Sequence, residues 1–143
     1  MIEGLIQTDL KIIPVEGGDV LHAMKDTDDG YSGFGEAYFS SIESKSIKAW
    51  KMHKNMVLNL VVPVGEVKFV FCDKRAGNLE FQEVILSHEN YKRLTVPPEI
   101  WFGFQGVSDK TSVLLNIANI KHDPDEVDRI NIEQIEYDWR NEE

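Results

Sequence analysis

The chain has 143 residues, of which 42% are hydrophobic and 28% are charged, and its formal net charge is −10. This length and composition indicate one globular domain over residues 1–143, and the excess of acids argues against nucleic acid as a partner because binding DNA or RNA requires neutralising phosphates. No apolar run approaches the roughly 20 residues of a membrane span and no signal peptide is recognisable. The single cysteine, Cys72, cannot form an internal disulfide, so we expect a cytoplasmic protein without a membrane partner.

The predicted elements are short strands separated by turn residues. Along the chain they cover residues 10–13, 20–24, 37–40, 47–54, 56–64, 67–71, 79–86 and 112–117. These runs are rich in β-branched and aromatic residues, and clusters of Gly, Asp, Asn and Pro lie between them. Helical periodicity is limited to single turns at 87–91 and at 123–126, where Pro124 follows a capping Asp123. The pattern predicts an all-β sandwich or closed barrel.

The strand at 47–54 carries the most informative side chains. Because residues two apart share a face of a strand, we expect Lys51 and His53 to point one way and Lys48 and Trp50 to point the other. His53 is either a general base, with an ordinary pKa near 6.5, or a wall histidine with a structural role. Lys51 either holds a developing anion, acts as a base after desolvation, or extends its charge to the rim of the barrel.

Charge is unevenly distributed along the chain. Residues 45–75 contain seven bases and two acids, a net of +5, whereas residues 122–143 contain nine acids and two arginines, a net of −7. One interpretation is scattered surface lysines with a solvated acidic extension from about residue 122. The other is a positive mouth for an anionic small molecule such as a nucleotide diphosphate, with Lys48, Lys68 and Arg75 as the candidate phosphate contacts.

The sequence lacks most of the ligand spacing that is usual in metal-binding barrels. That spacing is H-x-H, a Glu a few residues later, and a further His in the second half of the barrel. Here the first position is Lys51, the second is His53, and the segment starting at Pro97 ends in phenylalanine. One ligand of four remains, so we expect neither a metal nor another cofactor.

Six segments in one order, followed by a terminal aromatic-acidic motif, point to a known family. They are Gly35-Glu36-Ala37-Tyr38-Phe39-Ser40, Ile47-Lys48-Ala49-Trp50, Gly65-Glu66-Val67, Leu86-Ser87-His88-Glu89-Asn90-Tyr91-Lys92-Arg93-Leu94, Val96-Pro97-Pro98-Glu99-Ile100-Trp101-Phe102-Gly103-Phe104, His122-Asp123-Pro124-Asp125-Glu126-Val127 and Tyr137-Asp138-Trp139. Together they resemble the dTDP-4-dehydrorhamnose 3,5-epimerase family, in particular its shorter members. The sugar-nucleotide 3,4-ketoisomerases are similar in the same regions.

This resemblance implies a fold and an activity. The fold would be a cupin-type double-stranded β-helix, or jelly-roll barrel, with short helical turns near the C-terminus. The activity would be metal-independent 3,5-epimerisation of a dTDP-4-keto-6-deoxyhexose in surface-polysaccharide biosynthesis, carried out by a homodimer. The alternatives are a 3,4-ketoisomerase and a non-catalytic cupin that binds a sugar nucleotide or another small ligand.

The resemblance also places the site. The family's usual base histidine falls on Lys51, a second family histidine falls on Phe102, and the tyrosine that the 3,5-epimerases use falls near Leu115. The predicted catalytic group is therefore Lys51, His53 and Tyr38, the last of which lies in a segment that resembles the tyrosine-bearing strand of the ketoisomerases. The predicted substrate contacts are Lys48, Glu36, Trp101, Asn116, Lys68 and Arg75. Packing in the core is the alternative role for Tyr38 and Trp101, and pairing with backbone groups is the alternative for Asn116.

Overall fold

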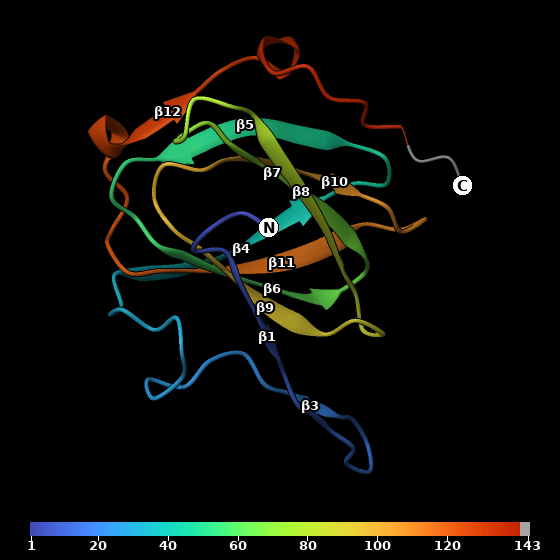
Figure 1. Cartoon of the computed structure of the whole chain (residues 1–143). Helices are drawn as coiled ribbons and strands as arrows, with labels where there is room; N and C mark the ends of the chain where they lie inside the picture. The colour runs from blue at the N-terminus through green and yellow to red at the C-terminus, as the bar shows by residue number, and fades with distance from the viewer. Residues whose placement is uncertain (141–143) are drawn as a thin grey trace.

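The computed structural model describes residues 1–140 and consists of two antiparallel five-stranded sheets that lie face to face (Figure 1). The first sheet has the order β1 (Ile6–Asp9), β9 (Lys92–Val96), β6 (Leu58–Val64), β11 (Ser112–Ala118) and β4 (Glu36–Ile42). The second has the order β12 (Val127–Arg129), β5 (Ile47–His53), β10 (Trp101–Gly106), β7 (Val67–Asp73) and β8 (Glu80–Leu86). This arrangement confirms the predicted all-β, cupin-type barrel.

Two smaller features complete the fold. A hairpin of β2 (Ile12–Ile13) and β3 (Val20–Leu21) projects from the body near the N-terminus. The only helical turns in the described residues are the 3-10 turns η1 (Pro124–Glu126) and η2 (Ile132–Gln134). Asp123 caps η1 by accepting a hydrogen bond from the Asp125 amide, as the sequence predicts, whereas residues 87–91 form a turn rather than a helix. Neither 3-10 turn, nor any other helix of residues 1–140, is long and apolar enough to cross a membrane.

The core lies between the two sheets because alternate residues of their strands point inward. Side chains such as Leu60, Phe69, Phe71 and Leu114 meet there and are almost completely buried. Every residue of β7 is buried, including those on its outer face. A strand buried on both faces needs a cover on each side, and the outer cover of β7 is the C-terminal segment.

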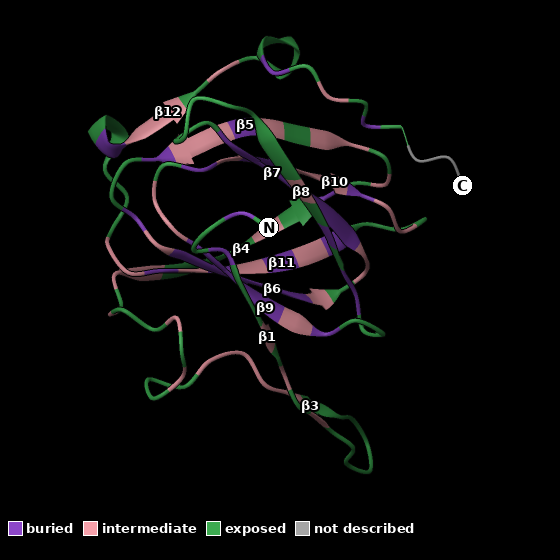
Figure 2. Cartoon of the chain, viewed as in Figure 1, coloured by how far each residue is buried: buried purple, intermediate pink, exposed green. Residues whose placement is uncertain are grey.

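The C-terminal segment packs against the outer face of the second sheet. Ile135 and Trp139 form a second buried cluster with Trp50, Val70 and Cys72. In Figure 1 this segment runs from η1 through β12 and along β5, and Figure 2 shows buried positions along its path. The residues from about 122, predicted as an acidic extension, therefore include a strand of the second sheet and the cover of its outer face.

A fully buried arginine holds the N-terminal loop against the first sheet. The Arg93 guanidinium donates to Oδ1 of Asn59 at 3.2 Å, to the Ala23 carbonyl at 2.8 Å and to Asp28 at 3.2 Å. Its NH2 group also donates to the Asp29 carbonyl. These bonds satisfy a charge that would be costly to bury alone, and they fix the path of residues 23–29.

Candidate functional site

A cavity of about 560 Å³ lies between the sheets, a volume typical of small-molecule sites. Its floor is apolar and comes from both sheets: Leu60, Phe69, Phe102, Phe104 and Leu114. Its polar and charged lining comes from β4, β5, β11, β12 and η2: Tyr38, Ser40, Lys48, Lys51, Asn116, Arg129, Asn131 and Gln134.

A β-bulge in β5 decides which of its side chains reach the cavity. Phe102 of β10 pairs with Lys51, but Gly103 pairs with Ala49, so Trp50 is an extra residue in the ladder. Gly103 allows this close approach, because a Cβ at that position would lie 2.5 Å from the Cβ of Ala49.

The bulge places Lys48 and Lys51 in the same cavity wall. The prediction that they point to opposite faces was wrong, since strict alternation fails at Trp50. Trp50 joins the outer cluster instead, where its ring centroid lies 5.3 Å from that of Trp139 and its indole donates to the Ile132 carbonyl at 3.1 Å.

The charged groups that line the cavity are all cations. Lys48 donates from Nζ to the Ser41 carbonyl at 2.7 Å, and Lys51 Nζ lies 5.6 Å from the centre of the Phe102 ring. Arg129 is the cross-strand partner of Lys51 on β12. Among the described residues, the lining contains no Asp or Glu. A purely cationic lining in a protein of net charge −10 favours an anionic ligand in this cavity.

Burial is the main cause that lowers the pKa of Lys51 below its ordinary value, and the nearby Arg129 lowers it further. Lys48 acts in the same direction, and only Glu126 acts against it. The neutral amine of Lys51 is therefore populated at a lower pH than that of a free lysine.

His53 forms a buried pair with Glu126, with 2.7 Å between Nδ1 and Oε1. The other carboxylate oxygen accepts from the backbone amides of Asn55 and Met56. Burial alone would raise the pKa of Glu126, but the hydrogen bonds from His53 and the two amides outweigh it and lower that pKa. Since burial also lowers the pKa of His53, the pair consists of a neutral imidazole that donates from Nδ1 to an ionised carboxylate.

The remaining nitrogen of His53 is a free acceptor. Nε2 is buried and has no hydrogen-bond partner within residues 1–140. His53 is not among the cavity-lining residues. Its ring centroid lies 6.5 Å from that of Phe102, with 26° between the ring planes, and Phe102 lines the cavity. His53 therefore lies beside the cavity wall, next to Phe102, which lies between the His53 ring and the cavity.

Tyr38 lies on the opposite sheet from Lys51, where it lines the cavity from β4. Burial raises the pKa of the Tyr38 phenol and the Glu36 carboxylate adds to this, so the hydroxyl stays protonated near neutral pH. Asn116 is the cross-strand neighbour of Tyr38 on β11, and its side-chain amide donates to Oγ of Ser40 at 3.4 Å. These groups form a neutral, hydrogen-bonding wall that faces the cationic one.

Four of the predicted substrate contacts lie outside this lining. Trp101 packs with the outer cluster, and Lys68 is buried on the outer side of β7, where its amine donates to the Trp139 carbonyl at 3.4 Å. Arg75 is bound to Asp73 at 2.9 Å near the end of β7. Glu36 begins β4 and affects the site only through its charge on Tyr38. The structure therefore brings Lys48 and Asn116 together with Lys51 and Tyr38, but not these four.

Sequence reasoning missed several residues of the site, among them Arg129 and Glu126. Both lie in the acidic stretch 122–143, which was interpreted by its net charge. The local pattern gave no strand signal, because Val127-Asp128-Arg129-Ile130 places two charged residues side by side and lacks the alternation of a half-buried strand. No cluster of three or more potential metal ligands occurs in the described part of the chain.

No protein-family model matches the chain. A solved dTDP-sugar isomerase from Desulfovibrio desulfuricans is 34% identical, with a TM-score of 0.89, and the match covers 92% of this chain and 87% of that one. The chain belongs to the dTDP-sugar isomerase family. The predicted kinship with the dTDP-4-dehydrorhamnose 3,5-epimerases and their relatives is thereby confirmed.

Two further solved structures share the fold, and one curated protein is similar in sequence. A dTDP-4-dehydrorhamnose 3,5-epimerase from Sulfolobus tokodaii has a TM-score of 0.82 at 20% identity, and the match covers 96% of this chain and 82% of that one. A sugar 3,4-ketoisomerase from Thermoanaerobacterium thermosaccharolyticum, solved with TDP, has a TM-score of 0.76 at 18% identity over 94% and 93% of the two chains. A probable low-salt glycan biosynthesis epimerase from Haloferax volcanii is 24% identical over 135 residues, which are 91% of this chain and 85% of that protein.

Proposed function

We propose that this protein is a metal-independent isomerase of a dTDP-linked 4-keto-6-deoxyhexose, with 3,5-epimerisation in surface-polysaccharide biosynthesis as the reaction. The observation that carries this proposal is the cavity with Lys48, Lys51 and Arg129 on one wall and Tyr38 on the other. Kinship with a dTDP-sugar isomerase supports the same substrate class. We also propose that the protein is cytoplasmic, as expected from the sequence.

The charges of the lining match those of such a substrate. A diphosphate brings two negative charges, and removal of a proton beside the ketone creates a third on the enolate oxygen. Three cations line the cavity, so each of these charges has a counterpart. Lys48 suits the diphosphate because it lies on the exposed side of the wall, and Arg129 is exposed as well, whereas Lys51 is half-buried against the Phe102 ring.

Proton transfer needs a base and an acid on the two sides of the sugar ring. Tyr38, kept protonated by its surroundings, is the acid on the β4 side. On the β5 side we assign Lys51 to the ketone and its enolate, and the His53–Glu126 pair to the base, since Nε2 of His53 is a free acceptor.

Proton exchange tests this function. The protein is incubated with dTDP-4-keto-6-deoxyglucose in heavy water, and the C3 and C5 protons are followed by NMR. We expect deuterium to enter at these carbons faster than without protein, and Tyr38→Phe to slow it by about 10²-fold, a typical loss for a proton carrier. Tyr31→Phe is the matched control, because Tyr31 lies in the N-terminal loop away from the cavity lining.

The alternatives predict other outcomes. A 3,4-ketoisomerase would give a product with its ketone at C3, which the same spectra distinguish from an epimer. A non-catalytic cupin would bind dTDP in a calorimeter and give no exchange above the protein-free rate. Either result would reject the 3,5-epimerase proposal.

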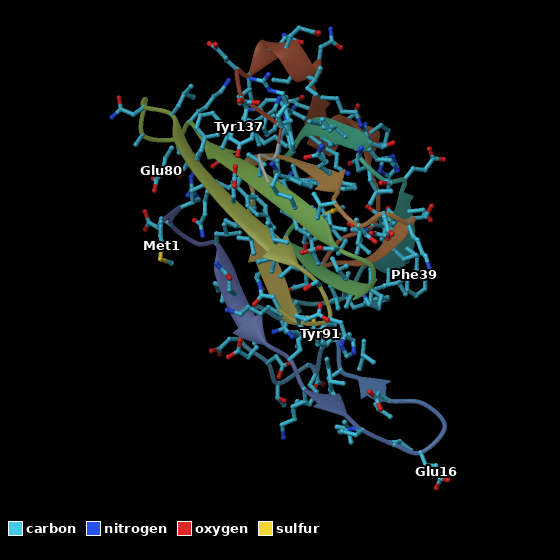
Figure 3. All side chains as sticks on the ribbon, turned by 90° about the vertical axis from the view of Figure 1, so that its right-hand side faces the viewer. Met1, Glu16, Phe39, Glu80, Tyr91 and Tyr137 are labelled. Atoms are coloured by element: carbon cyan, nitrogen blue, oxygen red, sulfur yellow. The ribbon has the colours of Figure 1, made fainter. Side chains whose placement is uncertain are left out.

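We further propose that the protein is a homodimer formed through the outer face of the first sheet. Phe39 of β4 points outward and is 69% exposed, and Phe34 and Val64 nearby are 63% and 52% exposed. Figure 3 shows Phe39 at the surface on the β4 side, away from Tyr137 and the C-terminal cover. An apolar patch of this kind on a sheet face is typical of a protein interface.

Light scattering coupled to size exclusion tests this interface. We expect a dimer mass for the wild type and a monomer mass for Phe39→Glu. Leu79→Glu is the control, since Leu79 is equally apolar and 56% exposed but precedes β8 in the other sheet. A monomeric wild type, or a dimeric Phe39→Glu protein, would contradict the proposed interface.

A further inference from the structure

Lys51 is a lysine without a carboxylate partner. Two other lysines have one, Lys54 with Asp128 at 3.8 Å and Lys92 with Asp9 at 3.7 Å, whereas Lys48 donates to the Ser41 carbonyl. No acid within residues 1–140 comes within ion-pair distance of the Lys51 amine, which faces the Phe102 ring instead. If the enzyme needed only a positive charge at this position, a carboxylate at ion-pair distance would hold the amine in its charged form. In the described part of the chain, Lys51 has no such carboxylate.

The groups that face this amine come from every neighbouring element. Lys48 lies on the same wall of β5, Arg129 lies across the ladder on β12, and Phe102 of β10 covers one side with an apolar ring. His53 follows on β5, and Glu126 of η1, already held by His53 and two amides, is the one nearby anion. A lysine that is desolvated and placed beside another fixed cation is activated as a nucleophile, because its amine form is favoured.

We propose that Lys51 acts as a covalent catalyst that forms an imine with the ketone carbon of the bound sugar. The inference rests on the proposed function, since it requires a ketosugar in the cavity. In this role Lys51 forms a covalent bond to the sugar instead of stabilising an enolate oxygen through its charge.

The chemistry balances without any further reactant. The Lys51 amine adds to the carbonyl carbon, and the resulting carbinolamine loses water to give a protonated imine. The imine nitrogen withdraws electrons from the neighbouring carbon, a base removes the proton there, and the electron pair moves to form an enamine. Tyr38, on the opposite sheet, returns a proton to that carbon, and water then releases the ketone and restores the amine.

The direction of the pKa shift agrees with this geometry. Burial first, and Arg129 next, lower the pKa of Lys51, while Glu126 opposes them. A lowered pKa leaves more neutral amine at a given pH, and the amine is the form that attacks a carbonyl.

Reductive trapping tests the imine. The protein is mixed with dTDP-4-keto-6-deoxyglucose and sodium cyanoborohydride, digested, and mapped by mass spectrometry. We expect one sugar adduct, on Lys51, and no adduct when dTDP-glucose, which has no ketone, replaces the ketosugar. An adduct distributed over Lys48 and surface lysines, or no adduct under conditions where calorimetry shows the ketosugar bound, would overturn the proposal.

Two matched variants separate a covalent role from an electrostatic one. Lys51→Arg keeps the positive charge but cannot form an imine, and we expect it to slow deuterium exchange by about 10²-fold or more and to abolish the adduct. Lys54→Arg changes the next lysine of the segment, outside the cavity lining, and we expect both readouts to stay as in the wild type.

The possible outcomes distinguish the imine proposal from the proposed isomerase function. If wild-type protein exchanges protons and Lys51→Arg does so at a similar rate, the imine is wrong and the isomerase function stands. If the wild type neither exchanges protons nor binds dTDP, the proposed function itself fails, and the imine with it. The thermal unfolding midpoint of Lys51→Arg is measured as well, to show that the variant is folded and that a loss of exchange does not come from unfolding.

Discussion

Replacing Glu126 by alanine should destabilise the protein strongly. The carboxylate is only 4% exposed and accepts hydrogen bonds from Nδ1 of His53 and from the amides of Asn55 and Met56. Each buried donor that loses its partner costs about 1–3 kcal/mol, so three donors give about 3–9 kcal/mol. That is a large part of the total for a small domain, which is typically about 5–15 kcal/mol.

Urea unfolding of the wild type and of Glu126→Ala at neutral pH measures this loss. Glu126→Gln keeps one accepting oxygen but loses the charge and turns the other oxygen into an NH2 donor, so we expect it to fall between the two. Glu136→Ala, at an exposed site of the same C-terminal segment, should stay within about 0.5 kcal/mol of the wild type. A loss below about 1 kcal/mol for Glu126→Ala would refute the view that three buried donors depend on this carboxylate.

The same experiment has a pH dependence with a fixed sign. The pKa of Glu126 is lowered in the fold from an ordinary value of 4.5, so the ionised form is the one that the fold stabilises. This contribution is fully present above pH 4.5 and is lost as the pH falls through the lower, folded-state pKa. The difference in unfolding free energy between wild type and Glu126→Gln should therefore shrink with acidification below pH 4.5, and a difference that grew would contradict the sign.

Three further changes test the cavity and its cover. Lys48→Ala should weaken dTDP binding by about tenfold and reduce its salt dependence, as calorimetry at two ionic strengths can measure, whereas Lys54→Ala should change neither. Gly103→Ala should also weaken dTDP binding, because the added methyl group would force the bulge in β5 apart; unchanged affinity would show that the bulge tolerates a side chain. Trp139→Ala should lower the unfolding free energy by about 3–5 kcal/mol in urea, since Trp139 is 7% exposed and packs on Trp50.

Much of the fold could be predicted from the sequence, because most strands are apolar and their periodicity is regular. Four strands were missed: β1 is short and mostly polar, and β9, β10 and β12 each break that pattern. β9 contains Lys92 and Arg93, the second of which is buried through its hydrogen bonds, and β10 contains Gly103 at the bulge. β12 lies in a segment dominated by acids. A buried charge or a bulge depends on partners distant in sequence, which a local pattern does not contain.

The site was predictable only where one strand supplies it. Lys51 and Tyr38 were recognised from their own strands and from the family resemblance, and both line the cavity. Arg129 lines it because β12 pairs with β5, a contact between residues 78 positions apart in the sequence. Lys68 and Trp101 were assigned to the ligand because cationic and aromatic side chains suit a nucleotide, but the alternation of β7 and β10 directs them to the outer face.

The position of β12 has a consequence for synthesis of the chain. The N-terminal part of a protein leaves the ribosome first, and here nearly all of the barrel precedes residue 120. A nascent chain that stops before Glu126 would leave the amides of Asn55 and Met56 uncapped, and it would lack Arg129 beside Lys51. Such a chain would also lack the cover that Ile135 and Trp139 provide, so we expect the barrel and its cavity to become stable only after the C-terminal segment has been made.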